Sequence, residues 1–327
     1  MKHKKLIIII SSICMFFVVL LCIYFFGYKT TVKRGYKEFY NNTEVFCKIP
    51  GLKTNYVPQA ISYNEAHQIF VIAGYDSEDE PSYVYILDKQ GKELKKVKIK
   101  LDENKYYTGH AGGVISFDNI IFVSSGKKVY KLSVDKVLSS VDEVTCDAVT
   151  KVDVDGATMF VYNNYLFVTE FYEETKYQTD VSHHLTTPVN YTNKALAFAY
   201  EIDSTNISGL KSNDAKMVVS IPEKIQGIVV KDNTLVVSQS FGRYNDSKIL
   251  TFKNILENET TYTFNYKNAK LPLYYLDDSS LINSLHSPSM TEGLCLYNNE
   301  VLVLFESAAK KYKLTCKCPV DKIYKLK

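Results

Sequence analysis

Five polar residues, one in each of five similar segments, carry the side chains best suited to chemistry. Each stands immediately before or at a recurring small residue. Carboxylates and an imidazole gathered in one place could hold a hard cation such as Ca²⁺, or supply an acid and a base for hydrolysis. We predict Glu292, Asp155 and His110 as catalytic residues, with Glu292 and Asp155 as metal ligands and Gln59 and Gln226 as binding residues. Each could instead cap a turn or bond a neighbouring backbone.

A second set of polar residues interrupts apolar runs a short distance further along the chain. Glu170, Gln239 and Glu306 follow runs such as YLFVT and VLVLF, where a carboxylate is expected to be paired, metal-bound or shifted in pKa. Arg243 is one of only two arginines in a lysine-rich chain. Its planar fork suits a carboxylate, sulfate or phosphate, so we predict a binding role for it, the alternative being an ordinary surface arginine.

The segments that carry these residues repeat one pattern, which predicts five hairpins. Each segment starts at a small residue, runs through a short apolar strand and an Asn- or Asp-rich turn, and continues into a second strand dense in Val, Leu and Phe. The five segments begin at Pro58, Ala111, Asp155, Gln226 and Glu292.

Further strands extend every hairpin towards a four-stranded unit. A third strand follows in all five units, and a fourth follows in four of them, the fourth unit taking its outer strand from TYTFNY at Thr261. The last unit has three strands, and EVFCKIP at 44–50 resembles the missing one. We therefore predict an all-β fold, a five-bladed β-propeller closed by residues 43–50, with six blades left open if 267–287 hides another.

The propeller topology predicts where the polar residues meet. First strands line the central channel, and the loops that enter them share one rim with the loops between second and third strands. The long segments 173–194, 267–288 and 307–321 are expected on this rim, where binding residues are common. The polar residues of the five hairpins should therefore converge at the axis.

The N-terminal segment predicts a membrane anchor. Residues 6–26 contain no charge and are long enough to cross the hydrocarbon layer as a helix. Bulky residues occupy the place where a signal peptidase would cut, which favours an uncleaved signal anchor over a cleavable signal peptide. We expect a cytoplasmic tail at 1–5, a transmembrane helix at 6–27, a linker at 28–42 and the propeller at 43–327 outside the cytoplasm.

The charge of the chain does not indicate a nucleic-acid partner. Six of the 39 basic residues flank the apolar segment, and the remaining 33 are outnumbered by the 36 acidic residues. The surface beyond the helix is therefore slightly acidic, unlike a nucleic-acid footprint.

Five cysteines lie beyond the apolar segment, an odd number. Cys47 lies in the strand proposed to close the ring, and Cys316 and Cys318 lie in the long rim loop of the same unit. We predict a disulfide from Cys47 to one of them, with Cys318 as the assigned partner, that links the two ends of the ring. A metal site at the Cys-x-Cys pair is the competing interpretation.

The small-residue starts QGIVV and EGLCL, each followed by an Asn-rich turn and a strand such as LVVSQ, resemble gluconolactonase, strictosidine-synthase-like and NHL-repeat propellers. The resemblance covers Pro58 to the C-terminus. It implies an axial divalent metal held by a glutamate that precedes a glycine, which Glu292-Gly293 matches. The family's Asn and Asp ligands have no clear counterpart here, and its propellers have six blades.

Three functions follow as hypotheses. The first is a membrane-anchored propeller that binds a small molecule, glycan or protein through its rim. The second is a metal-dependent hydrolase or lactonase with Ca²⁺ at the axis. The third is a structural partner of other envelope proteins.

Overall fold

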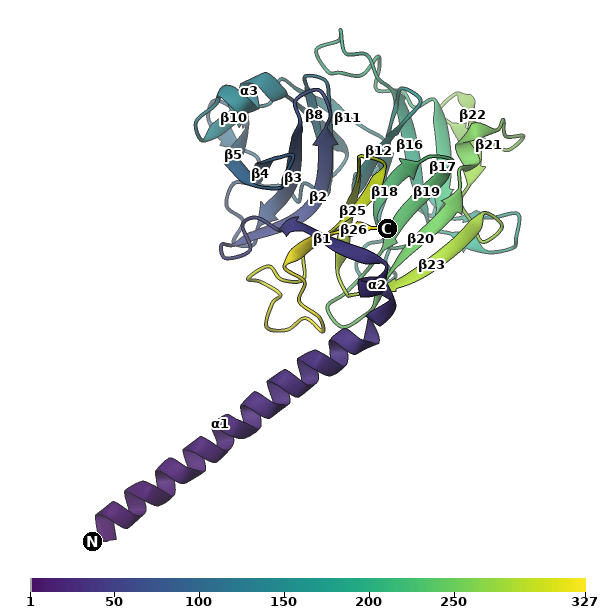
Figure 1. Cartoon of the computed structure of the whole chain (residues 1–327). Coiled ribbons are helices and arrows are strands. Elements are labelled where there is room, and N and C mark those ends of the chain that lie inside the picture. Colours follow the sequence, from purple (N-terminus) through teal and green to yellow (C-terminus); the bar gives the residue numbers. More distant parts are fainter. Residues whose placement is uncertain (1) are drawn as a thin grey trace.

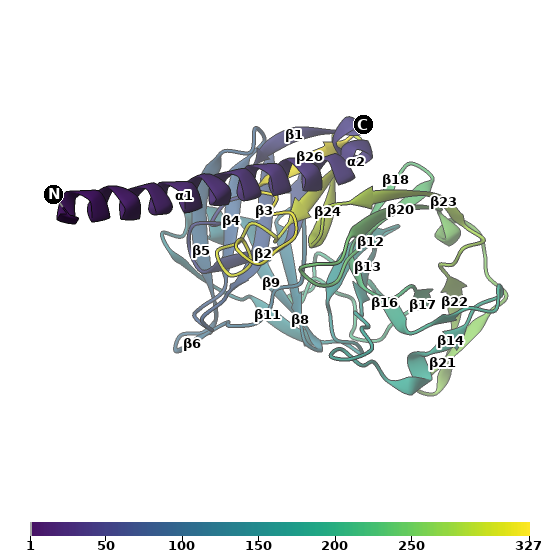
Figure 2. The same cartoon turned by 90° about the horizontal axis from the view of Figure 1, so that it is seen from below.

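The computed structural model describes the backbone of residues 2–327 and the side chains of residues 4–23 and 32–327. Met1 of the predicted tail lies outside these residues. The described chain forms one long N-terminal helix and a five-bladed propeller (Figures 1 and 2).

Each blade is a sheet that begins with an inner strand. In sheet order from the axis, blade one contains β2 (Tyr56–Asn64), β3 (Ile69–Asp76), β4 (Tyr83–Asp88) and β5 (Glu93–Asp102), with β6 (Lys105–Tyr106) and β10 (Glu143–Thr145) added to β5. Blade two contains β7 (Gly113–Phe117), β8 (Ile120–Ser125), β9 (Lys128–Ser133) and β11 (Ala148–Lys151), and α3 (Val134–Ser139) follows β9.

The remaining blades follow the same plan. Blade three contains β12 (Thr158–Tyr162), β13 (Tyr165–Thr169), β16 (Ala195–Glu201), β17 (Met217–Ile221), β22 (Ala269–Tyr275) and β21 (Thr263–Tyr266). Blade four contains β18 (Ile225–Lys231), β19 (Thr234–Gln239), β20 (Ser247–Lys253) and β23 (Leu281–Ser287). Blade five contains β24 (Thr291–Tyr297), β25 (Glu300–Phe305), β26 (Lys322–Leu326) and β1 (Thr43–Lys48). Shorter elements are η1 (Val181–His183), β14 (Leu185–Thr186), β15 (Thr192–Asn193) and η2 (Ile255–Glu257).

Turns and glycines explain why these sequences form blades. The hairpin turns place Asn163, Asn164, Asn298 and Asn299 at positive φ, between 46° and 65°, which asparagine tolerates better than most residues. A Cβ on Gly293 would lie 2.8 Å from the Cα of Ala60 in the next blade. The recurring small residues therefore let neighbouring inner strands approach closely at the axis.

The ring closes as predicted. The inner strands contact one another in the cycle β2, β7, β12, β18, β24 and back to β2. β1 pairs antiparallel with β26, with Thr43 opposite Leu326, and the backbone N–H of Lys327 donates to the carbonyl oxygen of Asn42 at 3.0 Å. The first and last strands of the propeller thus complete one blade, so its two ends lie together.

The outer strand of blade four was predicted wrongly. The TYTFNY segment forms β21, which pairs with β22 and so extends blade three, because β22 lies parallel to β17 with Leu273 opposite Val218. The fourth strand of blade four is β23 instead, paired antiparallel with β20. Residues 267–287 therefore supply strands to two existing blades and form no sixth blade.

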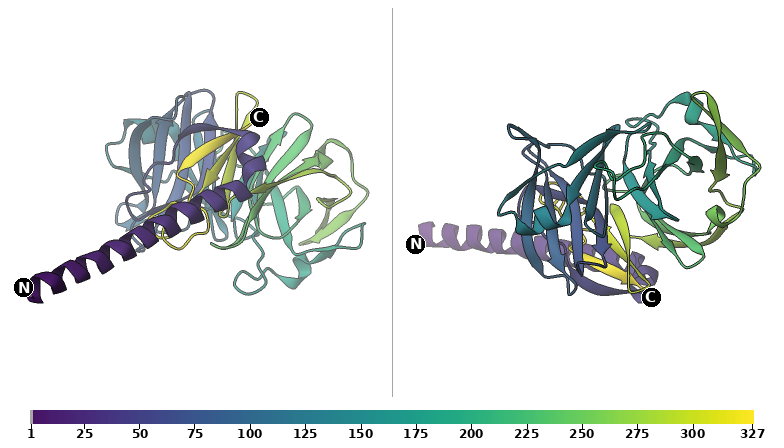
Figure 3. Two further views of the ribbon diagram at one scale, coloured as in Figure 1. Left: turned by 60° about the horizontal axis from the view of Figure 1, so that its bottom comes forward. Right: turned by 90° about the horizontal axis from the view of Figure 1, so that it is seen from above.

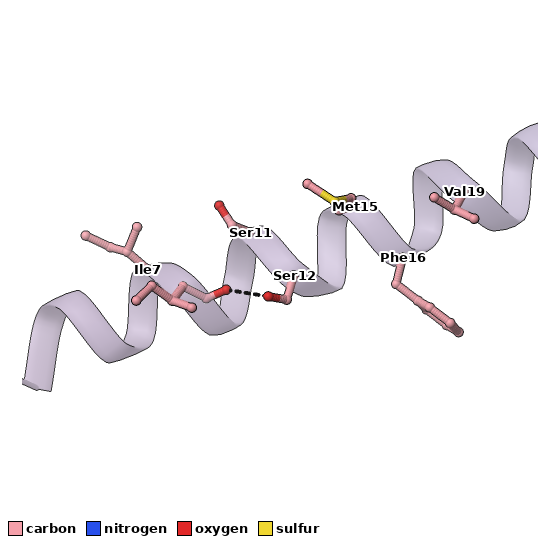
Figure 4. Close-up of a pocket in the computed structure, with 7 residues that line it drawn as sticks. Ile7, Ser11, Ser12, Met15, Phe16 and Val19 are labelled. Carbon is pink, nitrogen blue, oxygen red and sulfur yellow. Dashed lines mark hydrogen bonds between the residues drawn. The ribbon is translucent and has the colours of Figure 1, made fainter.

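The N-terminal helix α1 (Lys2–Gly35) stands away from the propeller (Figures 1 and 3). Its Lys4–Ile23 portion has a mean hydropathy of 3.2, is fully exposed and is long and apolar enough to cross a membrane. Figure 4 shows Ile7, Met15, Phe16 and Val19 splaying outward around Ser11 and Ser12. The shallow hollow between these side chains belongs to the candidate membrane span.

The segment expected as a linker is largely helical. α1 continues to Gly35, and α2 (Lys37–Asn41) packs on blades four and five. Phe39 is fully buried, and its ring makes edge contacts with Phe305 and Tyr324 at centroid distances of 5.8 and 5.5 Å. This burial joins the helix to the propeller through packed side chains.

Candidate functional site

Two glutamates from blade five form the centre of the candidate site. Glu292 lies on β24 with 2% of its surface exposed, and Glu306 directly follows β25. The two carboxyl groups are hydrogen-bonded to each other. We call Glu292 and Glu306 the acid pair.

Burial of the acid pair favours its protonated form. Burial first, and then repulsion by Glu306, raises the pKa of Glu292 well above its usual range. Burial also raises the pKa of Glu306, to about 7, although hydrogen bonds from Gln59 and Glu292 and the charges of Lys311 and Arg243 oppose the rise. Two carboxyls this close favour a state in which they share one proton.

β-Bulges place the polar residues of three inner strands at the rim. Pairing shifts register between Pro58 and Ala60, between Ile225 and Gly227, and between Thr291 and Leu294. The residues at these irregularities include Gln59, Gln226 and Glu292, the polar residues that the repeat analysis selected. A bulge redirects a side chain from the regular alternation of the strand, which explains the shared position.

A hydrogen-bonded chain leads from the acid pair to blade two. Gln59 donates through Nε2 to Glu306 Oε2 at 2.8 Å, and its Oε1 lies 3.2 Å from His110 Nδ1. The His110 ring stacks on Tyr75 with centroids 4.1 Å apart. Burial and the charge of Lys311 lower the pKa of His110, which favours the neutral imidazole. The predicted residues Glu292, Glu306, Gln59 and His110 therefore form one network.

The long loop 306–321 adds residues that the sequence analysis missed. Tyr312 OH lies 2.8 Å from Tyr75 OH, and Lys311 Nζ donates to Tyr75 OH at 3.0 Å. Arg243 lies over the Tyr312 ring, 4.8 Å from its centroid, and donates through Nη1 to Thr315 Oγ1 at 3.1 Å. Lys311 and Arg243 thus bring two cations to the Tyr312 ring, beside Tyr75 and the His110 end of the network. The only sequence signal for Lys311 and Tyr312 is their place in a long rim loop.

Other predicted residues are not joined to this network by the described contacts. Asp155 is exposed in the connection before β12, so the structure does not gather the predicted Glu292, Asp155 and His110 into one cluster. Gln226 is partly buried on β18, and Gln239 Nε2 donates to the carbonyl oxygen of Glu223 at 2.9 Å. Within the described side chains, no group of three or more His, Cys, Asp and Glu residues is placed to hold a metal ion.

Glu170 forms a separate pair on the same rim. His183 Nδ1 lies 2.9 and 3.0 Å from the two carboxylate oxygens of Glu170, and Leu196 N–H donates to Oε2 at 3.0 Å. The expected pairing of this buried acid is present. Its partners stabilise the loop that carries η1 and do not include the acid pair.

The predicted Cys47–Cys318 disulfide is not formed in the structure, where all seven cysteines are free thiols. Cys47 faces the turn between β4 and β5, because a Cβ on Gly91 would lie 2.6 Å from its sulfur. Cys318 faces α2, with its sulfur 3.9 Å from Tyr40 OH. Strand pairing and α2 packing, rather than a covalent staple, close the ring.

A group of four residues fastens the end of α1 to the rim. Asp246, in the loop between β19 and β20, pairs with His286 Nε2 at 2.9 Å and Lys317 Nζ at 2.6 Å, and accepts a hydrogen bond from Tyr36 OH. We call these four residues the Asp246 clamp. Lys317 N–H also donates to the carbonyl oxygen of Arg243 at 2.9 Å, so the clamp abuts the site.

Replacement of Asp246 by asparagine is expected to weaken the clamp in a pH-dependent way. Burial alone would raise the pKa of Asp246, but the bonds from Lys317, Tyr36 and His286 outweigh it and lower the pKa to about 2. The carboxylate therefore adds stability above its unfolded pKa that is lost as pH falls towards 2. We expect D246N to lower the unfolding free energy by about 1 kcal/mol at pH 7. Urea unfolding at pH 7 and pH 3 measures this, and an equal loss at both would contradict it.

Neither a known protein family nor a curated protein matches the sequence. Among solved structures, the glutaminyl cyclase of Myxococcus xanthus is 8% identical with a TM-score of 0.47, covering 87% of this chain and 95% of that chain. The hydrazine synthase of Kuenenia stuttgartiensis is 11% identical with a TM-score of 0.36, covering 76% and 65%, and the Dos1 propeller is 7% identical with a TM-score of 0.34, covering 80% and 68%.

The comparisons do not confirm the resemblance to gluconolactonase, strictosidine-synthase-like or NHL propellers. The cycle of inner strands and the β1–β26 pairing define the architecture directly. The chain is a five-bladed β-propeller that carries one N-terminal apolar helix.

Proposed function

We propose that the chain is a membrane-anchored propeller that binds a small polar ligand, a glycan or a protein segment on its rim. The observation that carries this proposal is the acid pair, held near the axis with Gln59, His110 and two cations at the His110 end of the network. Burying carboxyl groups costs free energy. A purely structural role at this position could be filled by uncharged side chains without that cost. A ligand that supplies both donors and acceptors would recover part of that cost.

We further propose that the propeller lies outside the cytoplasm with α1 as its signal anchor. A short basic tail precedes the apolar span, and such tails usually stay in the cytoplasm. No nucleic-acid partner is proposed, since acidic residues outnumber basic ones beyond α1.

Ligand binding is testable by thermal unfolding of the full chain in detergent. The panel contains hexoses, N-acetylhexosamines, dipeptides, phosphomonoesters and calcium chloride. At least one compound should raise the melting temperature of the wild type, because a ligand that binds only the folded state stabilises it. The E306Q variant should lose this shift, whereas the exposed E174Q control should keep it. A panel without any shift, or equal shifts in wild type and E306Q, would contradict the proposal.

Acid–base hydrolysis is the second candidate, and the shared proton favours it. A carboxyl that titrates near neutral pH can both donate and accept a proton there, as a general acid or base must. Ca²⁺ would require both carboxyls to be deprotonated and further oxygen ligands to be recruited. The melting temperature with calcium chloride therefore distinguishes a metal-dependent site, which calcium should stabilise, from a metal-independent one.

A further inference from the structure

The rim that carries the site faces the direction in which α1 leaves the propeller. Tyr36, just after α1, bonds Asp246 in one rim loop, and Asp246 pairs with Lys317 in the loop between β25 and β26. Figures 1 and 2 show the loop 306–321, in yellow, beside the propeller end of α1. With α1 in a membrane, the rim and its acid pair face the bilayer surface.

The reach of α1 places the rim near the lipid headgroups. Gly35, the end of the helix, lies nine residues beyond Phe26, the last residue of the uncharged apolar run, which is about 14 Å at 1.5 Å per residue. The headgroup layer takes up part of this distance. The loop 306–321 lies alongside this part of the helix and shortens the gap.

Two exposed side chains on the rim suit the membrane interface. Leu314, at the tip of the loop 306–321, is 95% exposed, and Tyr244, next to Arg243, is 71% exposed. The two loops are joined by the bond from Arg243 to Thr315. An apolar and an amphipathic aromatic side chain beside the site would gain free energy from contact with the interfacial layer.

The charges around the site select the kind of headgroup. Arg243 and Lys311 suit a phosphate, and the acid pair, which Gln59, His110 and Tyr75 connect to Lys311, suits an ammonium group. Because cations and carboxyl groups lie in one connected group here, the site suits a headgroup that carries both signs better than a purely anionic one.

We propose that the rim site binds the headgroup of a membrane lipid in which a phosphate is joined to a primary amine, as in phosphatidylethanolamine. The phosphate lies against Arg243 and Lys311, and the amine donates to Glu306 and Glu292. This assignment rests on the proposed ligand-binding function of the acid pair and names the ligand class.

The test uses the full chain in phosphatidylcholine nanodiscs into which phosphatidylethanolamine or phosphatidylglycerol is titrated. Hydrogen exchange of the peptide 306–321 is the readout. Phosphatidylethanolamine should slow exchange in a saturable way, and phosphatidylglycerol should not. R243Q and E306Q should each shift half-saturation by about tenfold, the loss of one charged hydrogen bond. Lys211→Gln, in the β16–β17 loop on the opposite face, is the matched control and should respond like the wild type.

The other outcomes overturn the assignment. Equal protection by phosphatidylglycerol would indicate general surface attraction, and no protection by either lipid would exclude a lipid ligand. Free phosphoethanolamine that binds the detergent-solubilised chain as tightly as the lipid in nanodiscs would assign a soluble ligand instead. Melting curves of R243Q and E306Q confirm that both fold. If phosphatidylethanolamine does not protect the loop while another compound of the panel binds through Glu306, only the lipid assignment is wrong. If neither the lipid nor any panel compound binds, the proposed ligand-binding function is wrong as well.

Discussion

A chain that lacks residues 37–48 is expected to lose cooperative unfolding altogether. This deletion removes α2 and β1, so β26 becomes an unpaired edge and the pocket of Phe39 in blade five is opened. Truncating one buried phenylalanine costs about 3–5 kcal/mol, and the lost strand pairing adds to it, while whole domains are stable by only about 5–15 kcal/mol. Circular dichroism during heating measures the transition.

The matched control for this deletion removes residues 2–24 and keeps α2 and β1. That shorter chain should melt cooperatively, because the apolar span contributes no buried surface to the propeller. A deletion of 37–48 that melts as sharply as this control would show that the ring does not depend on β1.

The acid pair is expected to make the protein less stable as pH rises. Folding raises the pKa of Glu306 to about 7 and that of Glu292 well above its usual range, whereas an unfolded glutamate titrates near 4.3. The folded state therefore holds more protons than the unfolded state between about pH 4.5 and 7. The contribution is fully present below the unfolded pKa and is lost as pH rises through the folded pKa.

Replacing Glu292 by glutamine should reduce this loss. The amide removes the repulsion between two carboxylates, so E292Q should exceed the wild type in unfolding free energy by about 1–3 kcal/mol at pH 8, on the scale of 1.36 kcal/mol per pKa unit. The difference should vanish near pH 4, where both carboxyls are neutral. Urea unfolding at several pH values measures both curves. E174Q, at an exposed position, should follow the wild type, and an E292Q curve parallel to the wild type would refute the shared-proton description.

The sequence predicted the propeller because its signals are local. Each hairpin carries a small residue at the axis, an Asn- or Asp-rich turn and β-branched strands, and the structure uses each signal for its expected purpose. The missing outer strand of the last unit pointed to residues 44–50, and β1 occupies that place. Closure was predictable because a propeller leaves few alternatives for an incomplete blade.

The strand order after blade three was not predictable from periodicity. β23 has mostly exposed residues, with only Leu285 and Ser287 buried, so it lacks the alternation that marks a strand. β22 pairs parallel with β17, a contact between segments about fifty residues apart that no local pattern encodes. The segment 261–287 was therefore assigned to the wrong blade.

The site was predictable only in part. Glu292, Gln59 and His110 were found because the repeat marks their positions, and Glu306 was found because a carboxylate interrupts an apolar strand. Asp155 shares the sequence position of Glu292 but lies exposed, because blade three has no bulge like that of β24. Lys311 and Tyr312 depend on the path of a long loop, which a sequence pattern does not fix.

The protonation of the acid pair tests the account most directly. Infrared difference spectra of the full chain between pH 5 and pH 9 report protonated carboxyl groups, and E292Q assigns the signal. We predict that one buried carboxyl stays protonated at pH 7 and that its band disappears in E292Q. A wild-type spectrum in which every carboxyl has ionised by pH 6 would contradict a shared proton between Glu292 and Glu306, and with it the site at the rim.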